Sequence, residues 1–368
     1  MKKIKNLNWW NININRKKTR ADLIKSFDKK FFSQGEISKK VENEICKKLK
    51  SKYCILTPSG TSAIFLSLLY FKIKINDPKK NEVIISDRSW ISPAHAAYFL
   101  NLKLVFVDTK KDKPVPDEND LISKINDKTL CIVCVQLNGR AVDVNYIKRK
   151  KKVLILEDAA KSFYSKTKNR FIGTNGDMGI FSFSMGKIVT SGQGGAIITN
   201  SNKIYKSIKL LKNNGIENRY EDKWNSPGLN FKFTDIQATI LLEQIKKIHD
   251  TKKKIIDLYY FYKKRLSDIP NIELVDEKLV EGRIPLYIEC YSRKKNLIFK
   301  KIKNSKKMLR VNYQSLHKTT YFKKYLGKKK SFKNSDNYSS YSFYLPSGPD
   351  QNIKKINILL NNLKKILS

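Results

Sequence analysis

Short apolar segments recur along the first two thirds of the chain, and amphipathic stretches separate several of them. The segments are rich in Val, Ile and Phe, and they are apolar throughout rather than at alternate positions, which is typical of strands covered on both faces. We predict strands at 82–86, 103–108, 130–137, 153–158, 179–184 and 195–200. We predict helices between them at 61–73, 92–100, 117–126 and 143–151. Strands that alternate with helices in this way indicate an α/β fold with a largely parallel sheet.

The pattern changes after residue 234. Residues 235–267 have one long helical period with lysines on the outer side, and we predict a helix that leads into a second, smaller domain. The remaining residues mix short strands with a final amphipathic helix in "INILLNNLKKILS". A chain of 368 residues is long enough for about two domains. We expect a large domain over 1–245, with residues 1–32 as an N-terminal arm, and a small α+β domain over 246–368.

The net charge of +42 is large, but it does not by itself indicate a nucleic-acid or membrane partner. A strongly basic chain can bind nucleic acid or an acidic membrane surface. Here the lysines are spread along the whole chain in short runs among many Asn and Ile residues, which favours a bias of genome base composition over a binding stripe. We expect no nucleic-acid partner.

Neither end of the chain nor the cysteines indicate export or a membrane. No apolar run reaches the roughly 18–20 residues of a membrane helix, and "MKKIKNLNWWNININRKKTR" lacks the apolar part of a signal peptide. Cys131 and Cys134 form a C-x-x-C inside the apolar segment "LCIVCVQL", with no second pair nearby, so buried reduced thiols are favoured over a zinc site. We expect a cytoplasmic enzyme.

The chemistry is expected where strands end, because ligands gather beyond the carboxyl ends of parallel strands. "TPSGTSAIFLSLL" places a Ser-Gly-Thr-Ser turn before an apolar helix, which suits a phosphate, although any helix cap looks similar. "ILEDAAKSF" ends a strand with Glu157 and Asp158, which suit acid–base work, metal binding or a helix cap equally well. Lys187 follows "GIFSFSMG" and precedes the glycine-rich turn "GQGG".

Together these features suit pyridoxal phosphate (PLP). Lys187 would form the Schiff base, a buried carboxylate would keep the pyridine nitrogen protonated, and the helix end would hold the phosphate. Trp90, in "SDRSWISPAH", offers an aromatic ring for stacking on the cofactor.

The order of these motifs resembles the DegT/StrS family of sugar aminotransferases. The resemblance rests on "SGTSA", "SW", "VFVD", "EDAAKSF", "GDMGIFSFSMGK", "GQGGAIITN" and "GLNFKFTDIQATI", and it runs from about residue 33 to 245. It resumes more faintly at "NYQSLHKTTYF" and "YLPSGPD". The family implies a fold-type-I aminotransferase, with a mostly parallel seven-stranded sheet and a smaller C-terminal α+β domain.

The resemblance also implies a role for individual residues. Lys187 would carry the cofactor, Asp158 would pair with its pyridine nitrogen, and Trp90 would stack on the ring. The phosphate would be held by a set of small and hydroxyl-bearing residues, with one asparagine from the neighbouring subunit of a homodimer: Gly60, Thr61, Ser62, Ser182 and Asn230.

Three positions depart from the family pattern. Lys161 stands where Gln is usual and is expected near the ring hydroxyl, Gln193 stands where Glu is usual, and Lys232 replaces an arginine. We predict that Lys161 tolerates replacement by Gln.

The family implies a two-stage reaction in which an amino donor, usually glutamate, gives its amino group to the cofactor and then to a ketone of a nucleotide-linked sugar. The released Lys187 would have to be neutral to move protons, through burial or a cationic neighbour. One rival is a sugar dehydratase of the same fold, in which His replaces the lysine. The other is a basic regulator without enzyme activity. Lys187, Asp158 and Ser182 are all present, which argues against both.

Of the three histidines, only His317 lies in a stretch, "NYQSLHKTTYF", where the family places a histidine beside the sugar. A neutral imidazole there could hydrogen-bond a sugar hydroxyl or exchange a proton with it. Cations and aromatic residues in the neighbouring segments would suit a diphosphate and a base: Arg219, Tyr220, Arg310, Tyr313 and Lys318.

Overall fold

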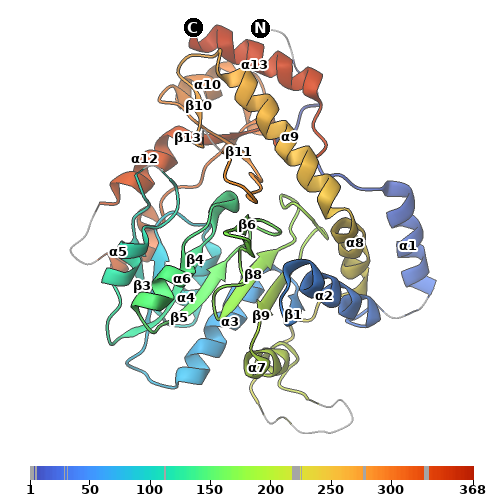
Figure 1. Cartoon of the computed structure of the whole chain (residues 1–368), viewed down its shortest axis with the longest axis vertical. Coiled ribbons are helices and arrows are strands. Elements are labelled where there is room, and N and C mark those ends of the chain that lie inside the picture. Colours follow the sequence, from blue (N-terminus) through green and yellow to red (C-terminus); the bar gives the residue numbers. More distant parts are fainter. Residues whose placement is uncertain are drawn as a thin grey trace.

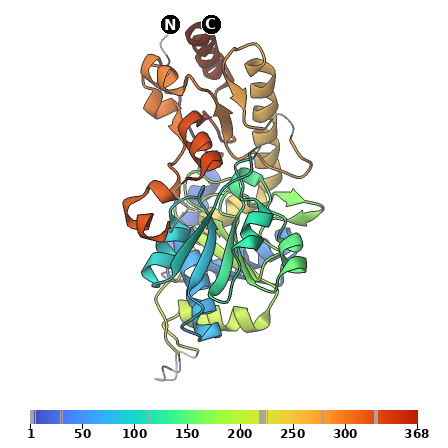
Figure 2. The same cartoon turned by 90° about the vertical axis from the view of Figure 1, so that its left-hand side faces the viewer.

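The computed structural model describes residues 4, 6–28, 30, 32–111, 113–217, 224, 226–276, 279–326 and 331–368. A large sheet with helices on both faces forms the lower part of the molecule in Figure 1. A smaller sheet with its own helices lies above it, and the C-terminal helix α13 (Ile353–Leu367) lies at that upper end. The side view in Figure 2 shows the same two-part stacking.

The large sheet confirms the predicted α/β architecture. In the described part of the chain it has seven strands in the order β1-β9-β8-β5-β4-β2-β3. The strands from β3 to β8 in this order are parallel, whereas β9 is antiparallel to both of its neighbours. All six predicted strands are present, and β1 is an additional one. The strands are β1 (Tyr53–Thr57), β2 (Glu82–Ser86), β3 (Lys103–Val107), β4 (Thr129–Val135), β5 (Leu154–Asp158), β8 (Met178–Ser182) and β9 (Gly195–Thr199).

Helices cover both faces of this sheet, as the continuously apolar strands predict. In β9, Ile197 belongs to an apolar cluster with α3 and α7, whereas Ala196 and Ile198 belong to a cluster with α2 and α8 on the other face. All four predicted helices are present as α3 to α6. The helices are α2 (Glu36–Leu49), α3 (Gly60–Ile75), α4 (Ser92–Phe99), α5 (Glu118–Ser123), α6 (Val144–Lys150), α7 (Asn202–Lys212) and α8 (Asp235–Lys246). Short elements between β4 and β8 are η1 (Leu137–Gly139), β6 (Lys166–Thr167) and β7 (Arg170–Phe171).

The prediction of one continuous helix over 235–267 is wrong, although nearly all of these residues are helical. The structure has two helices there, α8 and α9 (Ile248–Leu266), which meet at Lys247. The first packs on α1 and α2, and the second contributes Leu258 and Tyr262 to the C-terminal apolar cluster. No glycine or proline marks the break, so the apolar period runs through it unchanged.

The C-terminal region has its own antiparallel sheet and its own apolar cluster. Within the described residues the sheet has the order β10-β11-β13-β12, and α9, α10 and α13 contribute to the cluster. The division at 245/246 stays a prediction. The elements are β10 (Glu273–Leu274), β11 (Ile288–Tyr291), α10 (Lys295–Lys301), α11 (Ser305–Met308), β12 (Arg310–Val311), η2 (Leu316–Lys318), η3 (Thr320–Tyr325), α12 (Lys333–Tyr341), β13 (Ser342–Leu345) and α13 (Ile353–Leu367).

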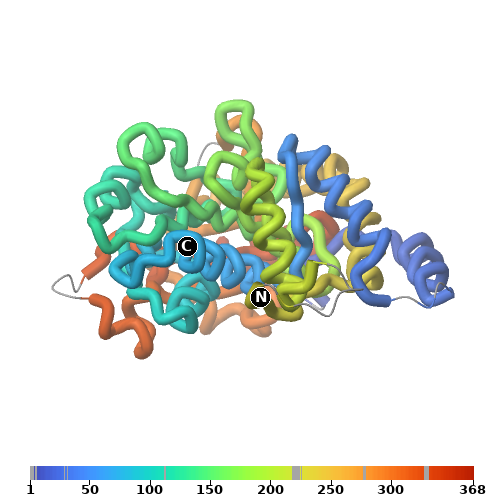
Figure 3. The backbone as a smooth tube through the Cα atoms, turned by 90° about the horizontal axis from the view of Figure 1, so that it is seen from below, coloured from blue at the N-terminus to red at the C-terminus, as the bar shows by residue number. Residues whose placement is uncertain are grey.

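The N-terminal residues touch both parts of the molecule. Leu7 belongs to the C-terminal apolar cluster, and Trp10 pairs with Ser347 in an isolated β-bridge. Helix α1 (Arg16–Asp28) then crosses to α8. It lies at one end of the molecule when seen from below (Figure 3).

Two further predictions concern the cysteines and the membrane. Cys131 and Cys134 are free thiols, buried in β4. In the ranges that the structure describes, no helix is both long enough and apolar enough to span a bilayer.

Candidate active site

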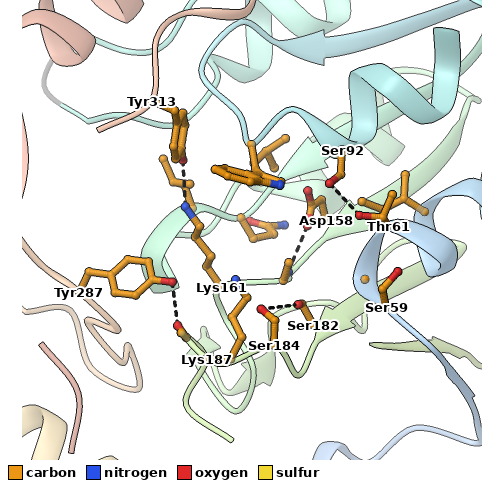
Figure 4. A pocket seen from close by; sticks show the side chains of 18 of the residues that line it. Ser59, Thr61, Ser92, Asp158, Lys161, Ser182, Ser184, Lys187, Tyr287 and Tyr313 are labelled. Carbon is orange, nitrogen blue, oxygen red and sulfur yellow. Dashed lines mark hydrogen bonds between the residues drawn. The ribbon is translucent and has the colours of Figure 1, made fainter. Parts of the chain in front are cut away.

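A cavity of about 300 Å³ lies beyond the carboxyl ends of β4, β5 and β8 and beside the first turn of α3 (Figure 4). The C-terminal region contributes four side chains to its wall. The cavity is lined by Ser59, Gly60, Thr61, Ile64, Trp90, Ser92, Val135, Gln136, Leu137, Asp158, Ala160, Lys161, Ser182, Ser184, Gly186, Lys187, Gln193, Tyr287, Arg310, Tyr313 and Tyr344.

The first turn of α3 forms one side of the cavity. Ser59 caps the helix, because its hydroxyl accepts a hydrogen bond from the Ser62 N–H at 3.0 Å. The Ser62 hydroxyl lies 2.8 Å from that of Ser59, so Ser62 supports the turn without lining the cavity. Gly60 and Thr61 do line it, and the Thr61 and Ser92 hydroxyls are hydrogen-bonded at 2.8 Å. The first N–H groups of a helix have no partner within the helix and attract anions.

Close backbone packing explains two glycines at this turn. A Cβ on Gly195 would lie 2.4 Å from the Ser59 carbonyl oxygen, and one on Gly60 would lie 2.9 Å from the Ser182 Cβ. Glycine at both positions therefore lets β9, β8 and the start of α3 meet. As a result, Ser182 faces the cavity next to the helix end.

The two acidic residues at the end of β5 have different surroundings. The Glu157 carboxylate accepts hydrogen bonds from the N–H groups of Gly173, Asn175 and Gly176. Glu157 therefore fixes the conformation of this loop and does not line the cavity. Asp158 lines the cavity with only 5% of its surface exposed. Within the described residues its carboxylate accepts one hydrogen bond, from the Ala160 N–H at 3.1 Å. Burial raises its pKa, although that N–H and the two cavity lysines oppose the shift.

Lys187 lies in the turn after β8, where its N–H donates to the Ser184 carbonyl at 3.1 Å. Burial lowers the pKa of its amine to about 8, with Asp158 opposing and the charge of Arg310 assisting the shift. The preceding carbonyl, of Gly186, accepts a hydrogen bond from the Tyr287 hydroxyl at 2.7 Å. The turn that carries Lys187 is thus fixed from the C-terminal region.

Lys161 reaches into the cavity on the side away from α3 (Figure 4). Its Nζ donates to the Tyr313 hydroxyl at 3.2 Å and lies 4.4 Å from the centre of that ring. Burial lowers its pKa well below the usual value, and the charge of Lys187 adds to this effect. Trp90 lines the cavity with 47% of its surface exposed, and its ring centre lies 6.0 Å from that of Tyr313.

Three of the remaining predicted residues, Asn230, His317 and Lys318, are not among those that line the cavity. Asn230 is exposed and forms an isolated β-bridge with Asn213. The His317 Nδ1 lies 2.8 Å from a carboxylate oxygen of Asp87, and its Nε2 lies 3.7 Å from one of Asp336. Lys318 forms an ion pair with Asp336 at 2.8 Å. Arg219 and Tyr220 fall outside the residues that the structure describes.

The sequence interpretation missed several residues of the wall. Ser184 belongs to the motif around Lys187, and Ser92 opens a predicted helix, so both carried a usable signal. Tyr287 lies in an ordinary apolar segment that only the fold brings to Lys187. Trp9 does not line the cavity, but its ring centre lies 5.8 Å from that of Tyr287, and it gave no signal either.

The donor set of the cavity fits PLP. A helix N-terminus with hydroxyl groups suits the phosphate, and a buried carboxylate with a single hydrogen bond suits a protonated ring nitrogen. Lys187 supplies an amine of lowered pKa on the same wall, as Schiff-base formation requires.

The sequence model of the DegT/DnrJ/EryC1/StrS aminotransferase family matches residues 13–364. A GDP-perosamine synthase of Escherichia coli O157:H7 is 30% identical over 246 residues, which cover 65% of this chain and 66% of the relative. A UDP-4-amino-4,6-dideoxy-N-acetyl-beta-L-altrosamine transaminase of Campylobacter jejuni is 25% identical, over 94% of this chain and 93% of the relative.

Two solved structures are similar in fold over nearly the whole chain. The Helicobacter pylori aminotransferase PseC, involved in the biosynthesis of pseudoaminic acid, has a TM-score of 0.90 at 22% identity, and the match covers 99% of both chains. The E. coli GDP-4-keto-6-deoxy-D-mannose-3-dehydratase with bound hydrated PLP has a TM-score of 0.88 at 20% identity, over 98% of this chain and 100% of the other.

Proposed function

The chain belongs to the DegT/DnrJ/EryC1/StrS aminotransferase family, and from this premise we propose that it uses PLP to move an amino group from glutamate to a keto-sugar. The sugar we propose is a nucleotide-linked 4-keto-6-deoxy sugar, and the product serves amino-sugar and surface-polysaccharide synthesis. The observation that carries the proposal is the cavity itself. Asp158, Lys187 and the N-terminus of α3 surround one space, although they lie far apart in the sequence.

Each of these groups has one task in the proposed reaction. Bound PLP supplies an electron sink that lets a carbon next to nitrogen lose its proton. The first turn of α3, with Thr61 and Ser182, holds the phosphate. Asp158 keeps a proton on the ring nitrogen, because a buried carboxylate gains most from a cationic partner.

Lys187 holds and moves the proton. An ordinary lysine with a pKa near 10.4 is almost fully charged at neutral pH and cannot accept one. A pKa of about 8 leaves a useful fraction of the Lys187 amine neutral, so Nζ can take a proton from the donor and return it to the sugar.

The test of the cofactor is direct. Purified protein should be yellow, and borohydride reduction should attach the cofactor to the peptide that contains Lys187. A label on any other lysine would contradict the assignment. Pyridoxamine-loaded protein, offered a panel of nucleotide-linked 3-keto and 4-keto sugars, should convert the 4-keto-6-deoxy members.

The sugar assignment follows the names of two relatives, a GDP-perosamine synthase and a UDP-linked altrosamine transaminase. A dehydratase remains the second candidate, because one also shares the fold. Lys187 favours the transaminase, since the family resemblance places a histidine there in the dehydratases. Appearance of an amino sugar rather than a deoxy sugar in the panel would separate the two.

We also propose a homodimer with shared sites. Asn230 lies outside the cavity and is exposed beside an exposed apolar residue, Leu229, as expected of a segment that reaches a partner. Mixing inactive Lys187→Ala subunits with inactive Asn230→Ala subunits should restore some activity in hybrid dimers. No recovery, given proven subunit exchange, would place each site within one chain.

For His317 we propose a role in the sugar stage only. His317→Ala should slow the transfer to the sugar and spare the reaction with glutamate. Because the ring contacts Asp87, which is completely buried, thermal unfolding of the variant should be measured alongside. Equal loss in both stages, or in neither, would remove His317 from the sugar site.

A further inference from the structure

Arg310 is a cation at the cavity wall, and none of the carboxylates that the structure describes pairs with it. It lies on β12, next to Tyr344 of β13, which also lines the cavity. Among the residues that the structure describes, no ion pair includes Arg310. Its charge nevertheless acts on the reactive lysine, because it helps to lower the pKa of Lys187.

Trp9 holds Arg310 in place. The guanidinium carbon lies 4.4 Å from the centre of the Trp9 ring. Stacking of this kind uses the flat face of the guanidinium and leaves its N–H groups, which lie in the plane, free to donate.

Trp9 is itself fixed by main-chain hydrogen bonds and by the turn that carries Lys187. Its N–H donates to the Lys307 carbonyl at 2.9 Å, and its carbonyl accepts from the Ser347 N–H at 2.6 Å. A Cβ on Gly186 would lie 3.1 Å from the edge of the Trp9 ring. The N-terminal segment thus reaches from Arg310 to the residue before Lys187.

We propose that Arg310, oriented by Trp9, binds the α-carboxylate of the amino donor. This inference rests on the proposed function, in which the nitrogen of an α-amino acid takes the place of the Lys187 amine. The carboxylate carbon is two bonds from that nitrogen, so its partner must lie beside Lys187. A guanidinium is suited to this role, because its planar fork matches a carboxylate with two parallel hydrogen bonds.

Lys161 is the other cation on this wall, and it is the weaker candidate. Its Nζ already donates to Tyr313, and its pKa is lowered well below the usual value, which favours the uncharged form. A guanidinium, by contrast, stays charged in proteins.

The test measures donor binding apart from turnover. 2-Methylglutamate has no α-hydrogen, so it should change the absorbance of the bound cofactor without being consumed, and a titration gives its dissociation constant. Arg310→Gln should raise that constant about 10- to 100-fold, the usual effect of losing a charge-assisted hydrogen bond. The dissociation constant of Arg310→Lys should lie between those of the wild type and Arg310→Gln. Lys306→Gln, which removes an exposed charge nearby, should leave the constant unchanged.

A second experiment tests whether Arg310 recognises the α-carboxylate of the donor. The wild-type enzyme should prefer glutamate over 4-aminobutyrate, which keeps the amine and the distal carboxylate but lacks the α-carboxylate. Arg310→Gln should remove most of that preference and leave the affinity for the keto-sugar within about 2-fold, since a contact removed from one substrate only affects that substrate. Trp9→Ala should weaken 2-methylglutamate binding by about 2- to 10-fold, as loss of a cation–π contact predicts, and Trp9→Phe should restore it.

Three results would overturn the inference. They are an unchanged dissociation constant, a preference for glutamate that survives in Arg310→Gln, or a loss confined to the sugar stage, which would make Arg310 a phosphate contact. If the wild-type protein binds no cofactor at Lys187, or no α-amino acid converts it, the proposed function fails instead. Circular dichroism and thermal unfolding show whether each variant is folded.

Discussion

Two groups of buried charges lie on either side of Tyr313, and they behave in opposite ways. One is the cavity, with Asp158, Lys161 and Lys187. The other, called the ion network here, joins the large sheet to the C-terminal sheet. Tyr313 separates them, with Lys161 at 4.4 Å from its ring centre and Arg88 at 5.7 Å. The ion network consists of Arg88, Arg140, Asp276, Arg283 and Glu289.

The carboxylates of the ion network are fully paired. Glu289 accepts from Arg88 at 2.9 Å and from Arg140 at 2.8 Å, and Asp276 pairs with both Arg140 and Arg283. These partners lower the pKa of Glu289 and Asp276 and raise that of Arg140, so the charged forms of these three are favoured despite burial, whereas burial and the charge of Arg140 lower the pKa of Arg283.

In the cavity, burial prevails instead. The pKa of Asp158 is raised and those of Lys161 and Lys187 are lowered, so all three move toward their neutral forms. Removal of a charge from solvent therefore has two different consequences in this molecule. Where partners compensate it, the charges hold the structure together, and where they do not, the groups are ready to exchange protons or to bind a charged ligand.

The largest expected effect is on turnover, and it comes from removing the Lys187 amine, whose pKa is lowered in the cavity. Lys187→Ala should reduce turnover by about 10⁴-fold or more, because both the cofactor linkage and the proton acceptor are lost. The folded state should keep most of its stability, since none of the ion pairs among the described residues includes Lys187. Turnover assays and urea unfolding measure the two quantities. Strong destabilisation would mean that the cavity, like the ion network, is part of the structural framework.

In the ion network, a substitution should lower the stability of the folded state strongly. Glu289→Gln leaves Arg88 and Arg140 buried beside a neutral group, so the free energy of unfolding should fall by about 3–5 kcal/mol. The measurement is the urea midpoint with its slope, and Lys187→Ala serves as the matched buried substitution. A loss no larger than that of Lys187→Ala would end the distinction between the two groups.

The third effect is a shift along the pH scale. Only the neutral amine of Lys187 can capture PLP, so the capture rate of cofactor-free protein should rise with pH and reach half its maximum near pH 8. The charge of Asp158 raises the pKa of Lys187, so Asp158→Asn should move this midpoint to lower pH. A midpoint near that of an exposed lysine, or a move to higher pH, would contradict the assigned surroundings.

The sequence predicted one of these regions far better than the other. The cavity is built from motifs at strand ends, where residue type, spacing and apolar strands all point to one edge of the sheet. These motifs pointed to Lys187 and to the acidic pair at the end of β5, and the family resemblance then singled out Asp158. Residues brought from elsewhere were not predictable: Tyr287 and Trp9 approach Lys187 only because the C-terminal sheet and the N-terminal segment fold against the same turn.

The ion network left no trace in the sequence. Arg88 and Glu289 lie 201 positions apart, and in so basic a chain neither Arg88 nor Arg140 stands out from the general charge excess. Arg310 was named from the sequence, but as a contact for a diphosphate and not for the carboxylate of an amino donor. The break between α8 and α9 was not predicted because the apolar period continues through it. Only the segments against which the two helices pack differ, and the sequence does not show them.

The smallest expected effect tests the residue that lies between the two regions. Lys161 is attracted by Glu289 and repelled by Lys187 and Arg310, and burial lowers its pKa well below the usual value. If it is neutral in the cavity, Lys161→Gln exchanges one uncharged hydrogen-bond donor for another, and turnover should stay within about 3-fold of the wild type, as expected where no charged contact is lost.

Lys161→Arg is the informative control, because a guanidinium cannot lose its charge. It would place a permanent cation beside Lys187 and Arg310, and it should slow turnover more than Lys161→Gln does, although it is the more conservative substitution by charge. Steady-state rates of the two variants decide the matter. If arginine were tolerated and glutamine were not, Lys161 would act as a charged partner of Glu289, and it would belong with the ion network rather than with the cavity.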